Sequence, residues 1–192
     1  MSPAKILFVR HCWLLKMKVF KLPLEEKQKR YLFFIMLLAL LACPCQTEAA
    51  SQRQNWYHDP FFQISDAISD CPKPAGPFVT ESERLTNAHH RAERGTSCWL
   101  AGKCDRPSSY DYDQDIAKAF KEALSKDYSF KDSTLWVTVQ GRVVFIEGCV
   151  REKSMSAKLE HFASRLPYVD IAVAHVRSNP TDEPPYILFD GP

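Results

Sequence analysis

Two β-rich runs between Ser133 and Val150, STLWVTVQ and RVVFIEGCV, restrict the fold more than any other part of the chain. Both are dense in β-branched and aromatic residues, and a tight turn around Gln140 and Gly141 separates them. Such a pair of runs, joined by a short turn that contains glycine, is typical of a β-hairpin. The sequence therefore predicts two paired strands here.

Helical patterns lie on both sides of this hairpin. The segment YDQDIAKAFKEALSKD before it and the segment EKSMSAKLEHFASRL after it repeat apolar residues at helical spacing, and Pro167 ends the second. The repeated residues are Ile116, Phe120, Ala123 and Leu124 in the first segment, and Met155, Leu159, Phe162 and Leu166 in the second. The run YVDIAVAHV predicts a last strand. The expected class is α+β, in the order helix, strand, strand, helix, strand.

This order and its residues resemble the BON domain of bacterial periplasmic and outer-membrane proteins, over residues 111–177. The matching positions are Asp113 or Asp115, Ile116, Leu124, Val137, Val139, Gly141, Val143, Gly148, Val150, Val169, Val173 and Val176. The resemblance implies an αββαβ domain, with a small three-stranded sheet and two helices on one face. It also implies an envelope-associated binding module that contacts phospholipid or other envelope proteins, and it brings no catalytic residues.

Two positions depart from the family pattern. Gly141 and Gly148 stand seven apart where the family commonly has six, which predicts a one-residue bulge in the second strand. Tyr168 replaces the usual glycine before the closing valine, and a tyrosine adopts a positive backbone angle less readily. Many relatives also carry two such domains, whereas this chain shows one.

The first 50 residues have the features of an export leader. Basic residues at 27–30 precede an apolar block over 31–42 and then small residues, which is the pattern of a secretory signal peptide. The block is shorter than the roughly 20 apolar residues that a membrane span needs. Met17 is a better start than Met1, because the first sixteen residues add no recognisable signal.

The cleavage point has two interpretations. Small residues favour a cut after Ala49 or Ala50, whereas LLAC resembles a lipobox and would make Cys43 a lipidated N-terminus. The first cut leaves an even set of four cysteines, which suits an oxidising compartment, and lipidation would leave Cys45 over. We expect an exported protein of the periplasm or outer membrane, with Cys43 as the alternative anchor.

Charge is distributed unevenly between the leader and the rest. Residues 1–50 hold eight Lys/Arg and three Asp/Glu, and residues 51–192 hold seventeen and twenty. The exported part is therefore mildly acidic, without the basic surface of a nucleic-acid binder.

The remaining segments are an extension over 51–109 and a Pro-rich tail over 178–192, which we expect to be irregular. The extension is loop-rich with one predicted helix over about 81–94. Thr80 and Glu83 fit a capping box at its start, and Gly95 is expected to end it.

Strand alternation places two aromatic side chains, Trp136 and Phe145, on the face of the sheet away from the helices, together with Cys149. Leu135, Val137, Val139, Val144, Ile146 and Val150 are then expected to face the helices. Two large aromatics on an open face are either a binding patch or covered by another segment. We take Trp136 and Phe145 as a candidate binding face.

The extension offers a cover for this face. Cys71 needs a partner, so we predict a Cys71–Cys149 disulfide that holds residues 55–75 near it, beside a short Cys98–Cys104 loop. Four cysteines allow three pairings, and the others stay open. We expect Trp99 in this short loop to pack inward. The loop either only braces the sheet or also presents Lys103 and its neighbours to a partner, and both residues join the candidate binding face.

A zinc site is the main chemical alternative. His89 and His90 precede Cys98 and Cys104, but adjacent histidines point to different sides of a helix, and the cysteines lack the close C-x₂₋₄-C spacing. We therefore expect no metal, no cofactor and no catalytic residues.

The sequence as a whole predicts a non-enzymatic, exported envelope protein with a BON-like domain. Its ligand would be an envelope phospholipid or a partner protein, with at most peripheral membrane association and no nucleic acid. The alternative is a small secreted enzyme or metal-binding protein that uses the region of His89, His90, Cys98 and Cys104.

Overall fold

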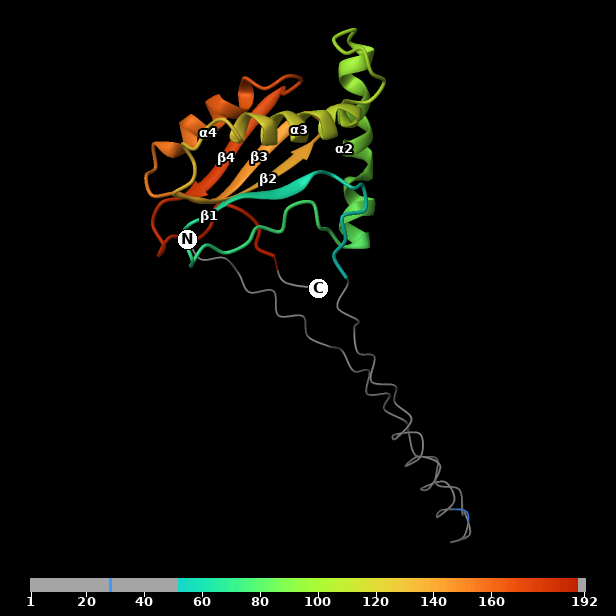
Figure 1. Cartoon of the computed structure of the whole chain (residues 1–192). Coiled ribbons are helices and arrows are strands. Elements are labelled where there is room, and N and C mark those ends of the chain that lie inside the picture. Colours follow the sequence, from blue (N-terminus) through green and yellow to red (C-terminus); the bar gives the residue numbers. More distant parts are fainter. Residues whose placement is uncertain (1–27, 29–51, 190–192) are drawn as a thin grey trace, which may run out of the picture. The chain divides into compact units, whose positions relative to one another are not determined.

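The computed structural model describes residue 28 and residues 52–189 (Figure 1). The predicted signal peptide, the choice between Met1 and Met17, the cut near Ala50 and the lipidation of Cys43 lie outside the described residues.

A four-stranded sheet forms the centre of the described part. Its strands are β1 (Phe61–Asp66), β2 (Thr134–Gln140), β3 (Val143–Cys149) and β4 (Ile171–Arg177), in that order across the sheet. The first two pairs are antiparallel, and β4 is parallel to β3. The α+β class is confirmed, and the sheet has one strand more than predicted.

Helices α3 (Asp113–Leu124) and α4 (Met155–Ser164) cover one face of this sheet (Figure 1). Leu135, Val137, Val139, Val144 and Ile146 are fully buried against Ile116, Phe120 and Leu159. The predicted orientation of both hairpin strands is therefore confirmed, and this apolar layer is the core of the domain.

The additional strand, β1, comes from the extension that was predicted to be loop-rich. Phe62 and Ile64 pack against the core, while Phe61 contacts Phe78 on the other face. The register with β2 shifts between Gln63 and Ser65, so a bulge interrupts the regular alternation. Because of this interruption, and because β1 is an edge strand, the sequence pattern did not predict β1.

The bulge predicted in the second hairpin strand is wrong. The β2–β3 register runs without a shift from Thr134–Cys149 to Gln140–Val143. Gly148 keeps its place in the ladder with a φ of 140°, where a Cβ would clash with the carbonyl oxygen of Thr134. The strand therefore accommodates the seven-residue glycine spacing through a backbone angle that glycine tolerates, without a bulge.

Tyr168 keeps the backbone conformation for which a glycine was expected. Its φ is 69°, and its ring packs against the ring of Tyr112 with a centroid distance of 5.1 Å. Its carbonyl oxygen accepts a hydrogen bond from Nε of Arg142 at 2.8 Å. Neighbouring side chains thus stabilise an angle that tyrosine rarely adopts by itself.

Helix α2 (Glu81–Leu100) is longer than predicted. The capping box at Thr80 and Glu83 is present, but the helix continues through Gly95. Gly95 is buried, and a Cβ there would lie 3.3 Å from the ring of Tyr110, so the glycine serves close packing. The helix ends at Leu100, and Gly102, which has a φ of 66°, closes a Schellman motif after it.

The face of the sheet away from α3 and α4 is covered by the chain itself. The Cys71–Cys149 disulfide attaches the extension to β3, and residues 73–75 pair with the tail. Ala75 N–H donates to the Ile187 carbonyl oxygen at 2.8 Å, and Phe189 N–H donates to that of Lys73 at 3.0 Å. Residues 178–189 of the tail form no regular helix or strand, and they meet the extension here through the isolated bridge between Pro74 and Leu188.

Glu147 lies half-buried under this cover, beside Ala75, Phe78 and Ile187, and burial raises its pKa from 4.5 to about 7. Because the folded protein holds this proton more tightly than the unfolded chain, stability should fall as the pH rises from about 4.5 to 7. We expect Glu147→Gln to be about 1–2 kcal/mol more stable than the parent at pH 8 and nearly equal to it at pH 4.5. Urea unfolding at several pH values measures this difference. The exposed Glu152→Gln is the control, and a pH-independent gain at position 147 would contradict the mechanism.

Candidate functional site

Both predicted disulfides are present in the structure. Cys71 is bonded to Cys149, and Cys98 is bonded to Cys104. Cys98 and Cys104 are therefore disulfide-bonded and offer no thiolate to the zinc ion of the alternative interpretation. His89 and His90 project into solvent and contact Glu93. Within residues 52–189, no group of three or more His, Cys, Asp or Glu side chains is arranged to hold a metal ion.

The four residues of the candidate binding face do not form one surface. Trp136 is only 8% exposed and Phe145 is half-buried, both on the covered face of the sheet. Trp99 is 47% exposed, so the expectation that it packs inward is wrong. The reason is the length of α2: Trp99 lies in its last turn, and this end of the helix projects past the sheet (Figure 1).

A different surface combines the properties of a binding site. A hollow of about 650 Å³, which we name the α3–α4 groove, lies between the end of α3 with the loop after it and one side of α4. Its lining comprises Ala123, Lys126, Asp127, Ser129, Phe130, Lys158, His161, Phe162, Arg165 and Leu166. A volume of this size lies within the usual range of ligand pockets.

The floor of the groove is apolar and rigid. The ring of Phe162 makes edge-to-face contacts with the rings of Phe120 and Phe130, each with a centroid distance of 5.3 Å. Phe120 and Phe130 belong to the buried core, whereas Phe162 and Leu166 remain half-exposed beside the groove. Such aromatic contacts favour a fixed ring geometry, so the floor is in place before a ligand arrives.

The rim of the groove is basic. Lys126, Lys158, His161 and Arg165 line it, and no carboxylate in residues 52–189 lies within 4.0 Å of their side-chain nitrogens. The acidic residue of the groove, Asp127, accepts hydrogen bonds from the Ser129 backbone and hydroxyl, which lower its pKa. The groove therefore carries an excess of positive charge, although residues 51–192 as a whole are mildly acidic.

Sequence reasoning missed this groove although part of the signal was present. Lys158, His161 and Arg165 recur three and four residues apart, which places them on one face of α4. Lys126 and Phe130 join them only through the packing of α3 and its following loop against α4. An amphipathic helix pattern does not distinguish an ordinary solvated face from the wall of a groove.

Comparison with known protein families agrees with the resemblance drawn from the sequence. The family model of the BON domain matches residues 112–175, from the start of α3 into β4, and this range includes the whole α3–α4 groove. No curated protein and no solved structure matches the chain. In the described residues, no helix is both long and apolar enough to cross a membrane.

Proposed function

We propose that this chain, which carries the BON domain at residues 112–175, is an exported, non-enzymatic protein of the cell envelope that binds anionic phospholipid in the α3–α4 groove. BON domains typically occur in exported envelope proteins and are generally non-enzymatic, which supports the envelope-associated binding role. The observation that carries the finer proposal is the combination, in one hollow, of an apolar aromatic floor and a basic rim whose side chains form no ion pair with any carboxylate of residues 52–189.

The two parts of a phospholipid correspond to the two parts of the groove. In this proposal the headgroup phosphate lies at the rim and accepts hydrogen bonds from Lys158 on α4, from Arg165 at the end of that helix and from Lys126 in the loop after α3; all three residues line the groove. The apolar part of the lipid then lies against Phe162 and Leu166. Apolar contact alone would not select a charged lipid, and a basic rim alone would not favour an amphiphile over a free anion.

The acidic charge of residues 51–192 does not oppose this interaction. Electrostatic forces between exposed groups decay over about 8–10 Å at physiological salt, so a lipid in the groove senses mainly the rim. A basic side chain close to an anionic membrane surface contributes roughly 1 kcal/mol. The rim residues together therefore contribute a few kcal/mol to the free energy of binding, and salt weakens this contribution.

Vesicle co-sedimentation tests the proposal. We expect the purified protein to bind phosphatidylglycerol vesicles more tightly than phosphatidylcholine vesicles, and we expect Lys158→Glu/Arg165→Glu to weaken that binding at least tenfold. The double change reverses the charge on one wall of the groove while leaving the floor intact.

The matched control is Lys118→Glu/Lys153→Glu, which makes the same charge change at exposed positions outside the groove lining. If both variants lose the same amount of vesicle affinity, the interaction depends on net charge alone, and the groove is not the binding site. Parent protein that binds no vesicle of either composition would contradict lipid binding and leave a partner protein as the ligand.

A further inference from the structure

The disulfide between Cys98 and Cys104 lies at the surface, at the C-terminal end of α2. Cys98 belongs to the last turn of that helix, and Cys104 follows the Schellman motif. Both cysteines are partly exposed, and the five residues between them are all exposed. The other disulfide differs, because its Cys149 is only 4% exposed. A small thiol in solution therefore approaches the Cys98–Cys104 bond more readily.

A guanidinium group contacts both sulfur atoms of this bond. Nη1 of Arg142 lies 2.8 Å from Sγ of Cys98 and 3.0 Å from Sγ of Cys104. Arg142 belongs to the turn between β2 and β3, 44 and 38 positions along the chain from the two cysteines. No carboxylate in residues 52–189 lies within 4.0 Å of its side-chain nitrogens. A positive charge without an ion-pair partner therefore faces the two sulfurs.

Contacts that do not involve the disulfide hold Arg142 in this place. Its backbone N–H donates to the carboxylate of Asp113 at 2.8 Å, and its Nε donates to the carbonyl oxygen of Tyr168 at 2.8 Å. The guanidinium carbon also lies 5.4 Å from the ring centroid of Tyr112. Because none of these contacts depends on the S–S bond, they hold the charge beside the sulfurs when that bond opens.

A fixed positive charge favours the thiolate form of a cysteine over the neutral thiol. A free cysteine thiol has a pKa of about 8.5, and a neighbouring arginine lowers it. The sulfurs of a disulfide carry no charge, so Arg142 stabilises the reduced state more than the oxidised state. A disulfide whose reduced form is stabilised is more easily reduced, and thiols of low pKa leave faster in exchange. The cysteines are six positions apart, unlike the C-x-x-C pairs of many redox sites, so the activation comes from the tertiary contact with Arg142.

We propose that Cys98–Cys104 is a redox-active disulfide that accepts two electrons from a dithiol, with Arg142 stabilising the thiolate that is released. One thiolate of the dithiol attacks a cysteine sulfur, and a mixed disulfide forms as the Cys98–Cys104 bond breaks. The electron pair of that bond leaves on the other cysteine sulfur, as a thiolate beside Arg142. The second thiolate of the dithiol then attacks its own sulfur in the mixed disulfide and releases the second cysteine.

The exchange is balanced without a further reagent. The dithiol ends as a disulfide, the protein gains two electrons, and the protons of the dithiol pass to the released cysteines or to solvent. Neither the two cysteines nor Arg142 lines the α3–α4 groove, so this site does not depend on the function proposed for that groove.

The charged and titratable groups around the sulfurs predict how the effect of Arg142 varies with pH. Besides Arg142 they are Arg94 one turn earlier on α2, Lys103, Asp105 and Arg106 beside Cys104, and Tyr112 and Tyr168 against Arg142. Arginine, lysine, aspartate and tyrosine ordinarily keep one charge state between pH 6.5 and 8, whereas a thiol beside an arginine titrates there. Asp113, with a pKa of about 6, accepts from backbone N–H groups of the turn that any side chain at position 142 leaves in place. The effect of Arg142 on reduction should therefore increase with pH.

Equilibration of the purified protein in buffers of reduced and oxidised dithiothreitol tests the proposal. Alkylation of free thiols, followed by peptide mass spectrometry, gives the reduced fraction of each disulfide separately. We expect Arg142→Gln to lower the equilibrium constant for reduction of Cys98–Cys104 at least about fivefold at pH 8, and about twofold or less at pH 6.5. Arg142→Lys should keep most of the parent's value at pH 8, because the charge remains although the hydrogen bond from Nε to Tyr168 is lost.

Two controls separate the sulfur contact from net charge and from a general loss of structure. Lys103→Gln removes an exposed charge beside Cys104, although within residues 52–189 only Arg142 donates to the two sulfurs, and it should change the constant less than about twofold. Reduction of Cys71–Cys149 in the same samples should be equal in the parent and in Arg142→Gln.

Three results would overturn the proposal. The first is an equal constant for the parent and Arg142→Gln at pH 8. The second is a decrease as large at pH 6.5 as at pH 8, which would make the role of Arg142 structural. The third is a loss in Arg142→Lys equal to that in Arg142→Gln, which would assign the effect to the hydrogen bond with Tyr168.

Discussion

Replacing Cys71 and Cys149 together by alanine is expected to lower the free energy of unfolding by about 4 kcal/mol. The bond joins residues 78 positions apart, so it restricts a long loop of the unfolded chain. In the chain-entropy description the stabilisation grows with the logarithm of loop length. The same bond attaches the extension to β3, so its loss should also loosen the cover over the buried Trp136.

Urea unfolding, followed by far-UV circular dichroism and by tryptophan fluorescence, measures both effects. The control is Cys98→Ala/Cys104→Ala, whose cysteines are only six positions apart and whose loss should cost about 2 kcal/mol. Equal decreases in the free energy of unfolding of the two double variants would show that loop length does not determine the stabilisation. A fluorescence transition that precedes the circular dichroism transition only in the first variant would identify the cover as the part released.

Asp113→Ala is the second substitution with a large expected effect, a loss of about 2–4 kcal/mol. Its buried carboxylate accepts hydrogen bonds from the backbone N–H groups of Gly141 at 2.7 Å and of Arg142 at 2.8 Å. Both turn residues have positive φ, 61° and 66°, the conformation of a type I′ hairpin turn. Removing the carboxylate leaves two N–H groups without partners and releases the turn from the start of α3.

Burial raises the pKa of Asp113 to about 6, so the carboxylate is mostly ionised at pH 7.5 and suited to accept both bonds. Thermal unfolding at that pH compares Asp113→Ala with Asp115→Ala. Asp115 forms an exposed ion pair with Arg106 at 2.7 Å, and its loss should cost under about 1 kcal/mol. Equal effects of the two substitutions would contradict the role of Asp113 in the turn.

The family resemblance did not choose between Asp113 and Asp115 in its acidic position. The two residues lie two positions apart near the start of the same helix, and a carboxylate is favourable at either position. Only the packing of the hairpin turn against the start of α3 shows that Asp113 is buried and hydrogen-bonded, while Asp115 remains exposed.

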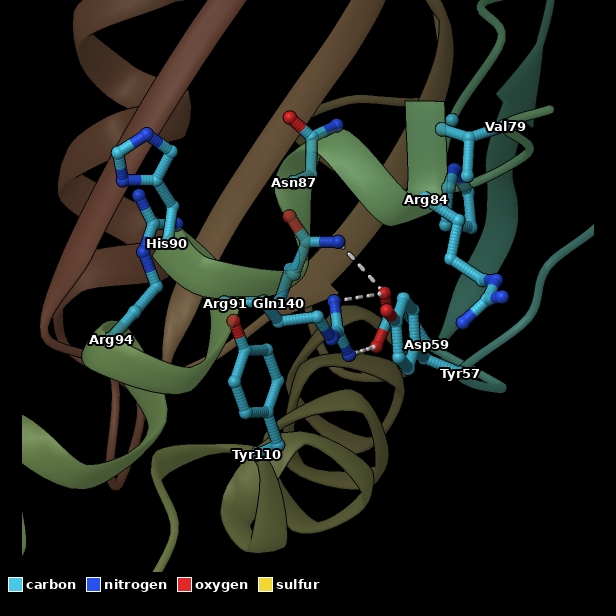
Figure 2. Close-up of a pocket in the computed structure, with 12 residues that line it drawn as sticks. Tyr57, Asp59, Val79, Arg84, Asn87, His90, Arg91, Arg94, Tyr110 and Gln140 are labelled. Carbon is cyan, nitrogen blue, oxygen red and sulfur yellow. Dashed lines mark hydrogen bonds and ion pairs between the residues drawn. The ribbon is translucent and has the colours of Figure 1, made fainter. Parts of the chain in front are cut away.

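The α3–α4 groove shows the same limit on a larger scale. It contains a run of basic residues, Lys158, His161 and Arg165, that can be read along α4 and its C-cap. A run of this kind usually belongs to a solvated surface. Asp59 and Gln140, which are joined by a hydrogen bond of 2.7 Å (Figure 2), are 81 residues apart in the chain, and no local pattern relates them.

The sequence by itself determined the elements whose signals are local. Apolar spacing predicted α3, α4 and the alternation of the hairpin strands. The even number of cysteines, together with the face of the sheet assigned to Cys149, led to the prediction of both disulfides. Tertiary structure decided what depends on distant neighbours: the edge strand β1, the passage of α2 through Gly95 against Tyr110, the exposure of Trp99, and the α3–α4 groove. The physical reason is that periodicity fixes which face a side chain occupies, whereas burial depends on which segment packs against that face.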